Sequence, residues 1–467
     1  MPDRRRTKIV ATIGPATHTH ERVRALVEAG MDAARLNFSH GTHEDHGTSA
    51  HLVRQVQAEL GRPLALIADL QGPKLRLGHL AKPRVLVKGE EVVIVGEGVA
   101  NDGDLPVAPS VISEVLKPGN DVLIADGRVR LEVLDVNAGR ARCVVVVGGE
   151  ISSHKGVNLP GVPIPVPSLT DKDLEDLEFA LGLGVDFVAL SFVRAAADVR
   201  ELKEIIARAN SSAQVIAKIE KPEAVDALDE ILAEADALMV ARGDLGVEVG
   251  AAMVPLMQKR IISRCLELGK PVITATQMLE SMIEHAEPTR AEASDVANAI
   301  LDGTAAVMLS AETAVGAYAV EAVETMVQIA RAVEPSVTYR HQLPGDRTAV
   351  RLAMSNAACD LAEALGAKAV LVPSYTGRTA SAVARLRPPW PIIGLSHHQT
   401  AVQQMALEWG VTPLLFPETA NVEDLWARAL DAARRAGILE RGDLVILMAG
   451  TAVNMPGSTN VIKIDTA

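Results

Sequence analysis

The chain has 467 residues, 48% of them hydrophobic, a length that suits two to four domains with large buried cores. No apolar run is long enough to span a bilayer, and a net charge of −13 with only 2% aromatic residues argues against nucleic-acid binding. The three cysteines lie far apart without the spacing of a zinc site, which is typical of a reducing, cytoplasmic location.

Apolar strand patterns alternate with helical patterns through much of the chain, and nearly every strand pattern ends in a polar or charged residue. Eight such units predict a closed parallel (β/α)8 TIM barrel, in which the strand ends meet at one face. We assign this catalytic barrel to residues 1–71 and 168–346. The expected strands are 8–13, 33–37, 64–69, 187–191, 214–219, 237–241, 271–276 and 305–309.

Residues 72–167 interrupt this alternation with short β patterns separated by Gly, Pro, Asn and Asp. They predict an inserted small β-barrel domain on the catalytic face, where an insertion can act as a lid. From residue 347 to 467 the alternation resumes with too few strands for a second barrel. We therefore expect a C-terminal open α/β domain with a regulatory role.

Two of the expected barrel strands stop abruptly in charged residues. Lys218 and Glu220 end one of them, and Arg242 and Asp244 follow the next. Two carboxylates can hold a hard divalent cation such as Mg²⁺ and leave positions open for substrate oxygens. With the two cations beside them, they predict a site for an anionic, above all a phosphorylated, substrate. The alternative is a pair of capped strands with solvated charges.

Nine motifs spread along the chain carry a family resemblance. They are TIGP at 12–15, RLNFSHG at 35–41, DLQGPK at 69–74, KGVNLP at 155–160, KIE at 218–220, RGDLG at 242–246, TATQMLESM at 274–282, PTRAE at 288–292 and LSAET at 309–313. In this order, and on this domain plan, the chain resembles pyruvate kinase along essentially its whole length.

The resemblance implies phosphoryl transfer from phosphoenolpyruvate to ADP, which gives pyruvate and ATP. It implies Mg²⁺, or Mn²⁺, held by Glu220 and Asp244, and a second Mg²⁺ that arrives with the nucleotide. Lys218 is expected beside the phosphoryl group, where it offsets the charge of that group and of the developing enolate. Arg35 is expected to hold the phosphoryl group as a bidentate fork.

The same resemblance places the substrate carboxylate at the backbone N–H groups of Gly243 and Asp244, with Thr276 beside it. Protonation of the enolate is linked to Thr276, through water and the pair Ser310 and Glu312. The residues expected near the nucleotide phosphates are Asn37, Ser39, His40, Arg76 and Lys155. Because Lys155 belongs to the insertion, closure of the lid would complete the nucleotide site.

Many relatives bind K⁺ near Mg²⁺, and the corresponding positions here are Asn37, Ser39, Asp69, Leu70 and Lys74. K⁺-dependent relatives carry Glu in place of Lys74, and Leu70, Gln71 and Leu77 also match the potassium-independent subset. The Lys74 ammonium could place a positive charge close to where K⁺ would sit. We therefore expect that K⁺ is not required. The alternative is a solvated Lys74, with K⁺ bound all the same.

A phosphate-binding pattern occurs in the C-terminal part, between an apolar strand and a helix. Its residues are Ser374, Thr376, Gly377, Arg378 and Thr379. Small hydroxyl residues and a glycine before a helix start form an anion nest, although an ordinary helix cap has a similar pattern. The resemblance implies an allosteric effector here, AMP or a sugar phosphate, and a homotetramer.

Two other functions stay open at the level of the sequence. One is a Mg²⁺-dependent lyase or aldolase that works through a pyruvate enolate on a related barrel, although such an enzyme needs no nucleotide lid with Lys155. The other is a non-catalytic metabolite sensor, against which Lys218 and Arg35 argue. An assay for ATP and pyruvate with Mg²⁺, phosphoenolpyruvate and ADP separates all three.

Overall fold

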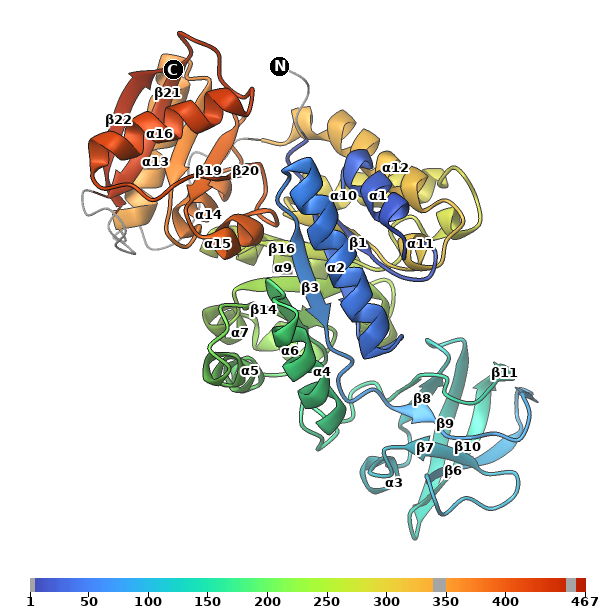
Figure 1. Cartoon of the computed structure of the whole chain (residues 1–467). Coiled ribbons are helices and arrows are strands. Elements are labelled where there is room, and N and C mark those ends of the chain that lie inside the picture. The colour runs from blue at the N-terminus through green and yellow to red at the C-terminus, as the bar shows by residue number, and fades with distance from the viewer. Residues whose placement is uncertain (1–4, 339–349, 451–458) are drawn as a thin grey trace.

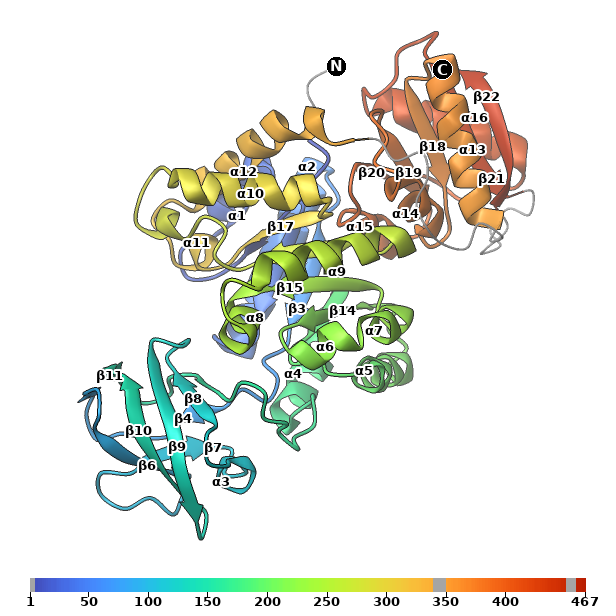
Figure 2. The ribbon, with the colours of Figure 1, turned by 180° about the vertical axis from the view of Figure 1, so that it is seen from behind.

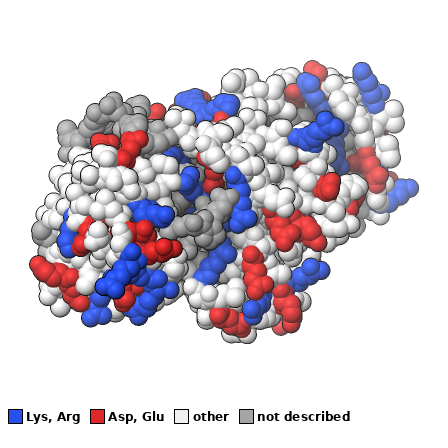
Figure 3. Space-filling model, turned by 90° about the horizontal axis from the view of Figure 1, so that it is seen from above, with Lys and Arg blue, Asp and Glu red and all other residues white. Residues whose placement is uncertain are grey.

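A computed structural model describes residues 5–338, 350–450 and 459–467. The chain forms a central barrel with an insertion at one end and a C-terminal domain at the other (Figures 1 and 2). Within the described residues, no helix combines the length and the apolar character that a membrane span requires. On the face seen in Figure 3, basic side chains lie interspersed with acidic ones.

The barrel is a closed sheet of eight parallel strands in the order β1-β17-β16-β15-β14-β13-β3-β2. Every expected strand is found, to within one residue at either end. Apolar side chains alternate between the inside of the sheet and the layer of surrounding helices, so both faces of each strand are buried. The strands are β1 (Lys8–Thr12), β2 (Ala33–Asn37), β3 (Ala65–Asp69), β13 (Phe187–Leu190), β14 (Gln214–Ile219), β15 (Ala237–Ala241), β16 (Val272–Ala275) and β17 (Ala306–Leu309).

Helices cover the outside of the barrel, and several begin with a capping box that satisfies the first free N–H groups. Two short helices rather than one lie between β14 and β15, because Ala227 (φ −86°, ψ 19°) leaves the helical conformation between them. The helices are α1 (His20–Ala29), α2 (His43–Leu60), α4 (Asp171–Gly182), α5 (Ala196–Arg208), α6 (Pro222–Asp226), α7 (Leu228–Glu234), α8 (Arg242–Val249), α9 (Val254–Leu268), α10 (Arg290–Asp302), α11 (Ala311–Ala314) and α12 (Ala319–Val333), with short 3-10 turns at Glu280–Ile283 and Glu334–Ser336.

The insertion is a seven-stranded sheet in the order β12-β8-β9-β10-β6-β7-β4, with a separate pair β11-β5. Its two edges meet, because Arg76 bridges to Gly156 and the N–H of Leu77 donates to the carbonyl of Lys155 at 2.8 Å. The sheet thus curls into the expected small barrel. The elements are β4 (Arg76–Leu77), β5 (Arg84–Leu86), β6 (Glu91–Gly96), β7 (Leu105–Ala108), α3 (Ile112–Val115), β8 (Asp121–Ile124), β9 (Val129–Asn137), β10 (Arg140–Val147), β11 (Gly149–Ile151) and β12 (Val157–Asn158).

The C-terminal domain is an open sheet in the order β20-β19-β18-β21-β22, with only β22 antiparallel. Helices α13, α14 and α15 pack on one face and α16 on the other, which gives two separate apolar layers. This is the expected open α/β domain. Its elements are α13 (Val350–Leu365), β18 (Ala369–Pro373), α14 (Arg378–Ala384), β19 (Ile392–Ser396), α15 (Gln399–Met405), β20 (Val411–Leu415), α16 (Val422–Arg435), β21 (Leu444–Gly450) and β22 (Thr459–Thr466).

The C-terminal domain contacts the end of the barrel where the strands begin. Lys8, the first residue of β1, donates from Nζ to the carbonyl of Val411 at 2.7 Å. Ala406 and Leu407 join the apolar cluster that fills the inside of the barrel. The opposite end, where the strands finish, therefore faces the insertion (Figure 1).

Candidate active site

Charged and polar side chains gather where the barrel strands end, although most of them are buried. Arg35 and Asp69 come from the ends of β2 and β3, and Lys218 and Glu220 come from the end of β14. Between 1 and 9% of each of these residues is exposed. Buried charges are stable only when they are paired, so their mutual contacts fix the shape of the site.

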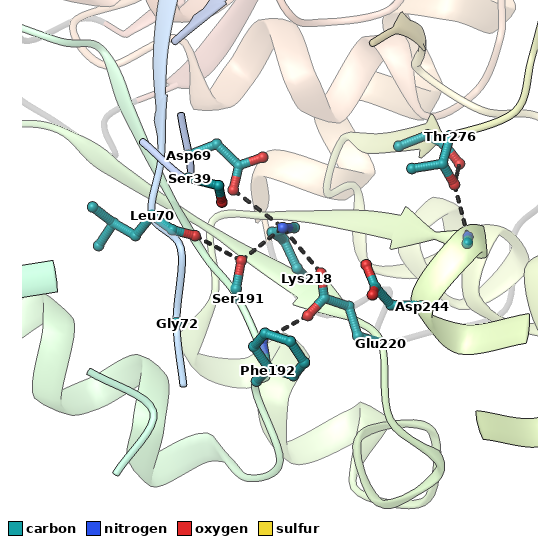
Figure 4. Close-up of polar contacts among 12 residues, drawn as sticks. Ser39, Asp69, Leu70, Gly72, Ser191, Phe192, Lys218, Glu220, Asp244 and Thr276 are labelled. Atoms are coloured by element: carbon teal, nitrogen blue, oxygen red, sulfur yellow. Dashed lines mark hydrogen bonds and ion pairs between the residues drawn. The ribbon is translucent and has the colours of Figure 1, made fainter. Parts of the chain in front are cut away.

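Lys218 is the centre of this network (Figure 4). Its Nζ lies 3.1 Å from Oδ1 of Asp69 and 3.0 Å from Oε1 of Glu220, and it donates to Oγ of Ser191 at 2.6 Å. Burial opposes its charge, but the two carboxylates outweigh burial and raise the pKa of Lys218 above its ordinary value. The lysine is therefore a fixed cation at the mouth of the barrel.

Arg35 and Lys218 share one carboxylate. Nε of Arg35 donates to Oδ2 of Asp69 at 2.7 Å, and Nη1 donates to Oγ1 of Thr12 at 3.1 Å. Burial alone would raise the pKa of Asp69, but Lys218 and Arg35 overcome it and hold that pKa below its ordinary value. One carboxylate thus orients two cations, and Nη2 of Arg35 has no hydrogen bond to any described residue.

The two predicted metal ligands, Glu220 and Asp244, each contact a lysine. Oε2 of Glu220 also accepts the N–H of Phe192 at 2.8 Å, and Lys74 reaches to 3.4 Å from Oδ1 of Asp244. Burial raises the pKa of Glu220 above its ordinary value although Lys218 opposes it. No group of three or more His, Cys, Asp and Glu in the described parts of the chain could hold a metal. A pair of carboxylates is nevertheless enough for Mg²⁺, which takes few protein ligands and completes its shell with substrate oxygens and water.

Thr276 lies beside Gly243, as the sequence predicts. Its Oγ1 accepts the N–H of Gly243 at 2.8 Å and donates to the carbonyl of Ala275 at 2.6 Å. Its φ is +67°, a strained conformation for a β-branched residue, and Arg242 supports it with a 2.7 Å hydrogen bond to the Thr276 carbonyl. A substrate carboxylate would have to take the Gly243 N–H from this hydroxyl.

Ser310 and Glu312 lie next to one another after β17. The two oxygens of Glu312 accept the N–H groups of Ser310 at 2.7 Å and Leu279 at 3.2 Å, so this buried carboxylate ties two loops together. Oγ of Ser310 is buried without a hydrogen-bond partner. Of the pair, the serine hydroxyl is therefore the group left available for a water or a substrate.

The predicted nucleotide residues fall on two sides of the barrel mouth. Asn37 and Ser39 follow β2, where Oδ1 of Asn37 accepts the N–H of Ser39 at 3.3 Å. Burial lowers the pKa of the next residue, His40, and the cations Arg76, Arg35 and Lys74 lower it further. Arg76 and Lys155 belong to the insertion. Arg76 is thus near enough to His40 to affect its pKa, although it belongs to the insertion.

Of the positions predicted for a monovalent cation, Asp69, Leu70 and Lys74 already have partners in the structure. Both oxygens of Asp69 contact cations, and the carbonyl of Leu70 accepts the hydroxyl of Ser191 at 2.7 Å. Lys74 lies at the edge of this place, paired with Asp244. The structure thus puts the lysine ammonium beside Asp244, one of the two predicted metal ligands.

The predicted effector residues lie in the C-terminal domain, far from the barrel mouth (Figure 1). The segment from Ser374 to Thr379 joins β18 to α14, and Gly377 has a φ of +78° immediately before that helix. The hydroxyls of Thr379 and Thr459 are 2.9 Å apart. Arg378 begins α14, and Thr376 is exposed on the loop.

Ser191, Phe192 and Thr12 also take part in the site, although no role was predicted for them. Ser191 is the polar residue that follows β13, and a polar residue at a strand end is the sequence signal for such a role. Phe192 contributes its backbone N–H, which no side-chain pattern reveals. Thr12 ends β1 and hydrogen-bonds Arg35 from the neighbouring strand.

Comparisons with known proteins agree over nearly the full length. The family model "Pyruvate kinase, barrel domain" matches residues 4–323, and "Pyruvate kinase, alpha/beta domain" matches residues 352–465. Pyruvate kinase 2 of Synechocystis is 45% identical over 99% of this chain and 79% of its own length. The pyruvate kinases of Mycobacterium intracellulare and Agrobacterium vitis are 46% and 44% identical, over 98% and 99% of this chain and 98% of each relative. The chain therefore belongs to the pyruvate kinase family.

Proposed function

We propose that the phosphotransferase reaction of this chain takes place at the ends of β2, β3, β14 and β15. In that reaction phosphoenolpyruvate and ADP give pyruvate and ATP, the last step of glycolysis. The observation that carries the proposal is the Lys218 ammonium, fixed between Asp69 and Glu220 beside Arg35. Fixed cations in a water-poor site stabilise charge that develops during phosphoryl transfer.

Lys218 and Arg35 act on the phosphoryl group itself. Lys218 offsets the charge of the group in flight and of the enolate that it leaves behind. Nη2 of Arg35 is directed to the phosphoryl oxygens, because Nε and Nη1 are held by Asp69 and Thr12. The family is generally Mg²⁺-dependent, and Glu220 and Asp244 are the residues that would hold Mg²⁺ or Mn²⁺, whose charge neutralises the anionic substrate.

Thr276 and its neighbours act on the pyruvate half of the substrate. The N–H groups of Gly243 and Asp244 bind the carboxylate, and Thr276 gives up its bond to Gly243 when substrate enters. We assign protonation of the enolate to Thr276 with a water held at Ser310, whose buried hydroxyl has no other partner. Glu312 positions Ser310 by accepting the backbone N–H of Ser310.

The insertion, bounded at residues 72–167, acts as a lid over the nucleotide. Arg76 and Lys155 approach the phosphates of ADP from the lid, while Asn37, Ser39 and His40 line the barrel side. A lid that carries cations favours this kinase reaction over a lyase or a silent sensor, neither of which needs a nucleotide site.

Four further proposals concern the cation requirement, regulation, assembly and location. Lys74 substitutes for K⁺, since its ammonium lies beside Asp244. AMP or a sugar phosphate binds at the loop from Ser374 to Thr379 and activates the enzyme, which assembles as a homotetramer. The enzyme acts in the cytoplasm, in keeping with its three buried cysteines, which form no disulfide with one another.

The test is direct. Purified protein is mixed with Mg²⁺, phosphoenolpyruvate and ADP, and ATP and pyruvate are measured together, with and without K⁺, AMP and sugar phosphates. Equal amounts of the two products support the kinase. Cleavage of phosphoenolpyruvate or of a pyruvate adduct without ADP would instead support a lyase, and no turnover at all would support a sensor.

A further inference from the structure

The lid is joined to the barrel by a short hinge segment, residues 70–72, which follows β3. Gly72 has a φ of +70°, and its N–H donates to Oδ1 of Asp173 at 3.0 Å. A Cβ atom on Gly72 would lie 2.8 Å from Cδ2 of Phe192 and 3.0 Å from Cβ of Ser191. Real Cβ atoms do not approach so closely, so the hinge segment rests directly on these two residues.

Ser191 connects the hinge segment to the catalytic lysine through one hydroxyl. Its Oγ lies 2.6 Å from Nζ of Lys218 and 2.7 Å from the carbonyl oxygen of Leu70, and only 1% of the residue is exposed. An ammonium can only donate, so the serine oxygen accepts from Lys218. The single hydroxyl hydrogen must then point to the carbonyl of Leu70. The hydrogen bonds therefore run in one direction, from Lys218 to Ser191 and from Ser191 to Leu70.

The next residue, Phe192, binds Glu220, the carboxylate that pairs with Lys218. Its N–H donates to Oε2 of Glu220 at 2.8 Å from a left-handed backbone with φ +54°. Such a conformation is costly for a bulky residue and persists only where its surroundings enforce it. Two adjacent residues therefore contact the hinge segment on one side and both Lys218 and Glu220 on the other (Figure 4).

We propose that Ser191 is a positioning residue that couples the lid hinge to Lys218. When the lid closes, Leu70 moves, and the Ser191 hydroxyl carries that movement to the lysine ammonium. The phosphoryl-transfer geometry of Lys218 is thereby completed only when the nucleotide lies beneath the lid. This inference rests on the proposed role of Lys218, but its effect on the hinge can be measured without turnover.

The experiment compares Ser191→Ala with Ser191→Thr, which keeps the hydroxyl, and with the matched control Ser355→Ala. Ser355 is also buried and donates to a backbone carbonyl, at 2.8 Å, but lies in the C-terminal domain. Each variant is assayed for kcat and for KM toward phosphoenolpyruvate. Hydrogen exchange of the peptide that covers residues 70–74 is followed by mass spectrometry without substrate.

Ser191→Ala is expected to lower kcat by about tenfold or more while KM changes less than about threefold. It should also speed exchange at residues 70–74 by about fivefold. Ser191→Thr should restore both quantities, and Ser355→Ala should change neither. Should Ser191→Ala fail to fold, Ser191→Cys, whose thiol is a weak hydrogen-bond partner, is expected to shift both readouts in the same direction.

If Ser191→Ala lowered kcat but left hydrogen exchange at residues 70–74 unchanged, the proposed coupling would be wrong. Ser191 would then position Lys218 without any effect on the hinge segment. An equal loss in Ser355→Ala would reduce the effect to the removal of any buried hydroxyl. A Lys218→Met variant that stays active would refute the proposed catalytic role, whereas hinge exchange in Ser191→Ala would still decide whether Ser191 holds the hinge.

Discussion

Lys218 is a buried cation, and in the proposed mechanism its charge acts mainly in the transition state. Lys218→Met should lower kcat by about a thousandfold or more and change KM for phosphoenolpyruvate only a few-fold, because the lost interaction strengthens as charge develops. The measurement is steady-state turnover on a variant whose fold is checked by circular dichroism. Lys203→Met is the control, since this lysine pairs with Asp236 on the outside of the barrel. Wild-type turnover in Lys218→Met would contradict the assignment.

Lys74 offers a second test at the level of a single side chain. Turnover in buffer free of potassium and sodium should equal turnover with KCl, because the Lys74 ammonium already lies 3.4 Å from Asp244. Lys74→Glu should lower activity and make it respond to K⁺, whereas Lys82→Glu, an exposed position in the lid, should do neither. Activation of the wild type by about tenfold on adding KCl, above an ionic-strength control, would refute the proposal.

At the scale of elements, the junction between β3 and the lid depends on a glycine that has no room for a side chain. Gly72→Ala should lower kcat by about tenfold, because the new Cβ would push against Phe192 and Ser191. Gly61→Ala is a matched control, since Gly61 also has a positive φ, +60°, but no atom lies within 4 Å of its added Cβ. The control should lose about 1 kcal/mol of stability and keep its turnover. Equal kcat in the two variants would show that the hinge tolerates displacement.

The segment after α15 carries a carboxyl group that should make stability depend on pH. Burial raises the pKa of Glu408 from an ordinary 4.5 to about 7, although Ser381, Arg387 and Lys8 oppose it. The folded protein holds this proton more tightly than the unfolded chain, so the group stabilises most below about pH 4.5 and its contribution declines as pH rises to about 7. Glu408→Gln, a neutral mimic, should therefore be more stable than wild type at pH 8, by up to about 3 kcal/mol, and no more stable at pH 4.5.

Thermal unfolding at the two pH values tests this expectation. Glu423→Gln, an exposed position on α16, is the control and should leave the difference between the two pH values unchanged. A Glu408→Gln variant that is less stable at pH 8 would show that the ionised carboxylate is the form that the fold prefers.

The sequence predicted the elements well and the contacts between them incompletely. Buried parallel strands end visibly in the sequence, because an apolar run gives way to Asp69 or Glu220. That Arg35 and Lys218 both pair with Asp69 was not predictable. The contact depends on the order of β2, β3, β13 and β14 around the closed barrel, which the sequence does not reveal. The left-handed backbone of Phe192 and Thr276 was equally hidden, because their residue types favour other conformations.

For the whole molecule, the proposed effector loop and the barrel mouth lie at opposite ends. Activation by AMP or a sugar phosphate therefore requires a coupling free energy across the barrel. Saturation by phosphoenolpyruvate should be sigmoidal without effector and less so with it, and Thr376→Glu should abolish the response by placing a like charge in the anion nest. Glu418→Gln in the same domain should respond normally. An intact response of Thr376→Glu to every effector tested would place the site elsewhere.

Ala406 and Leu407 link the stability of the C-terminal domain to that of the barrel. They belong to the C-terminal domain, yet they complete the apolar interior of the barrel. Unfolding of either domain would expose the apolar surface of the other at this contact. The two domains are therefore expected to unfold in one cooperative transition. A ligand that binds only the folded C-terminal domain then also protects the barrel from denaturation, by mass action, at a distance and without touching a single catalytic side chain.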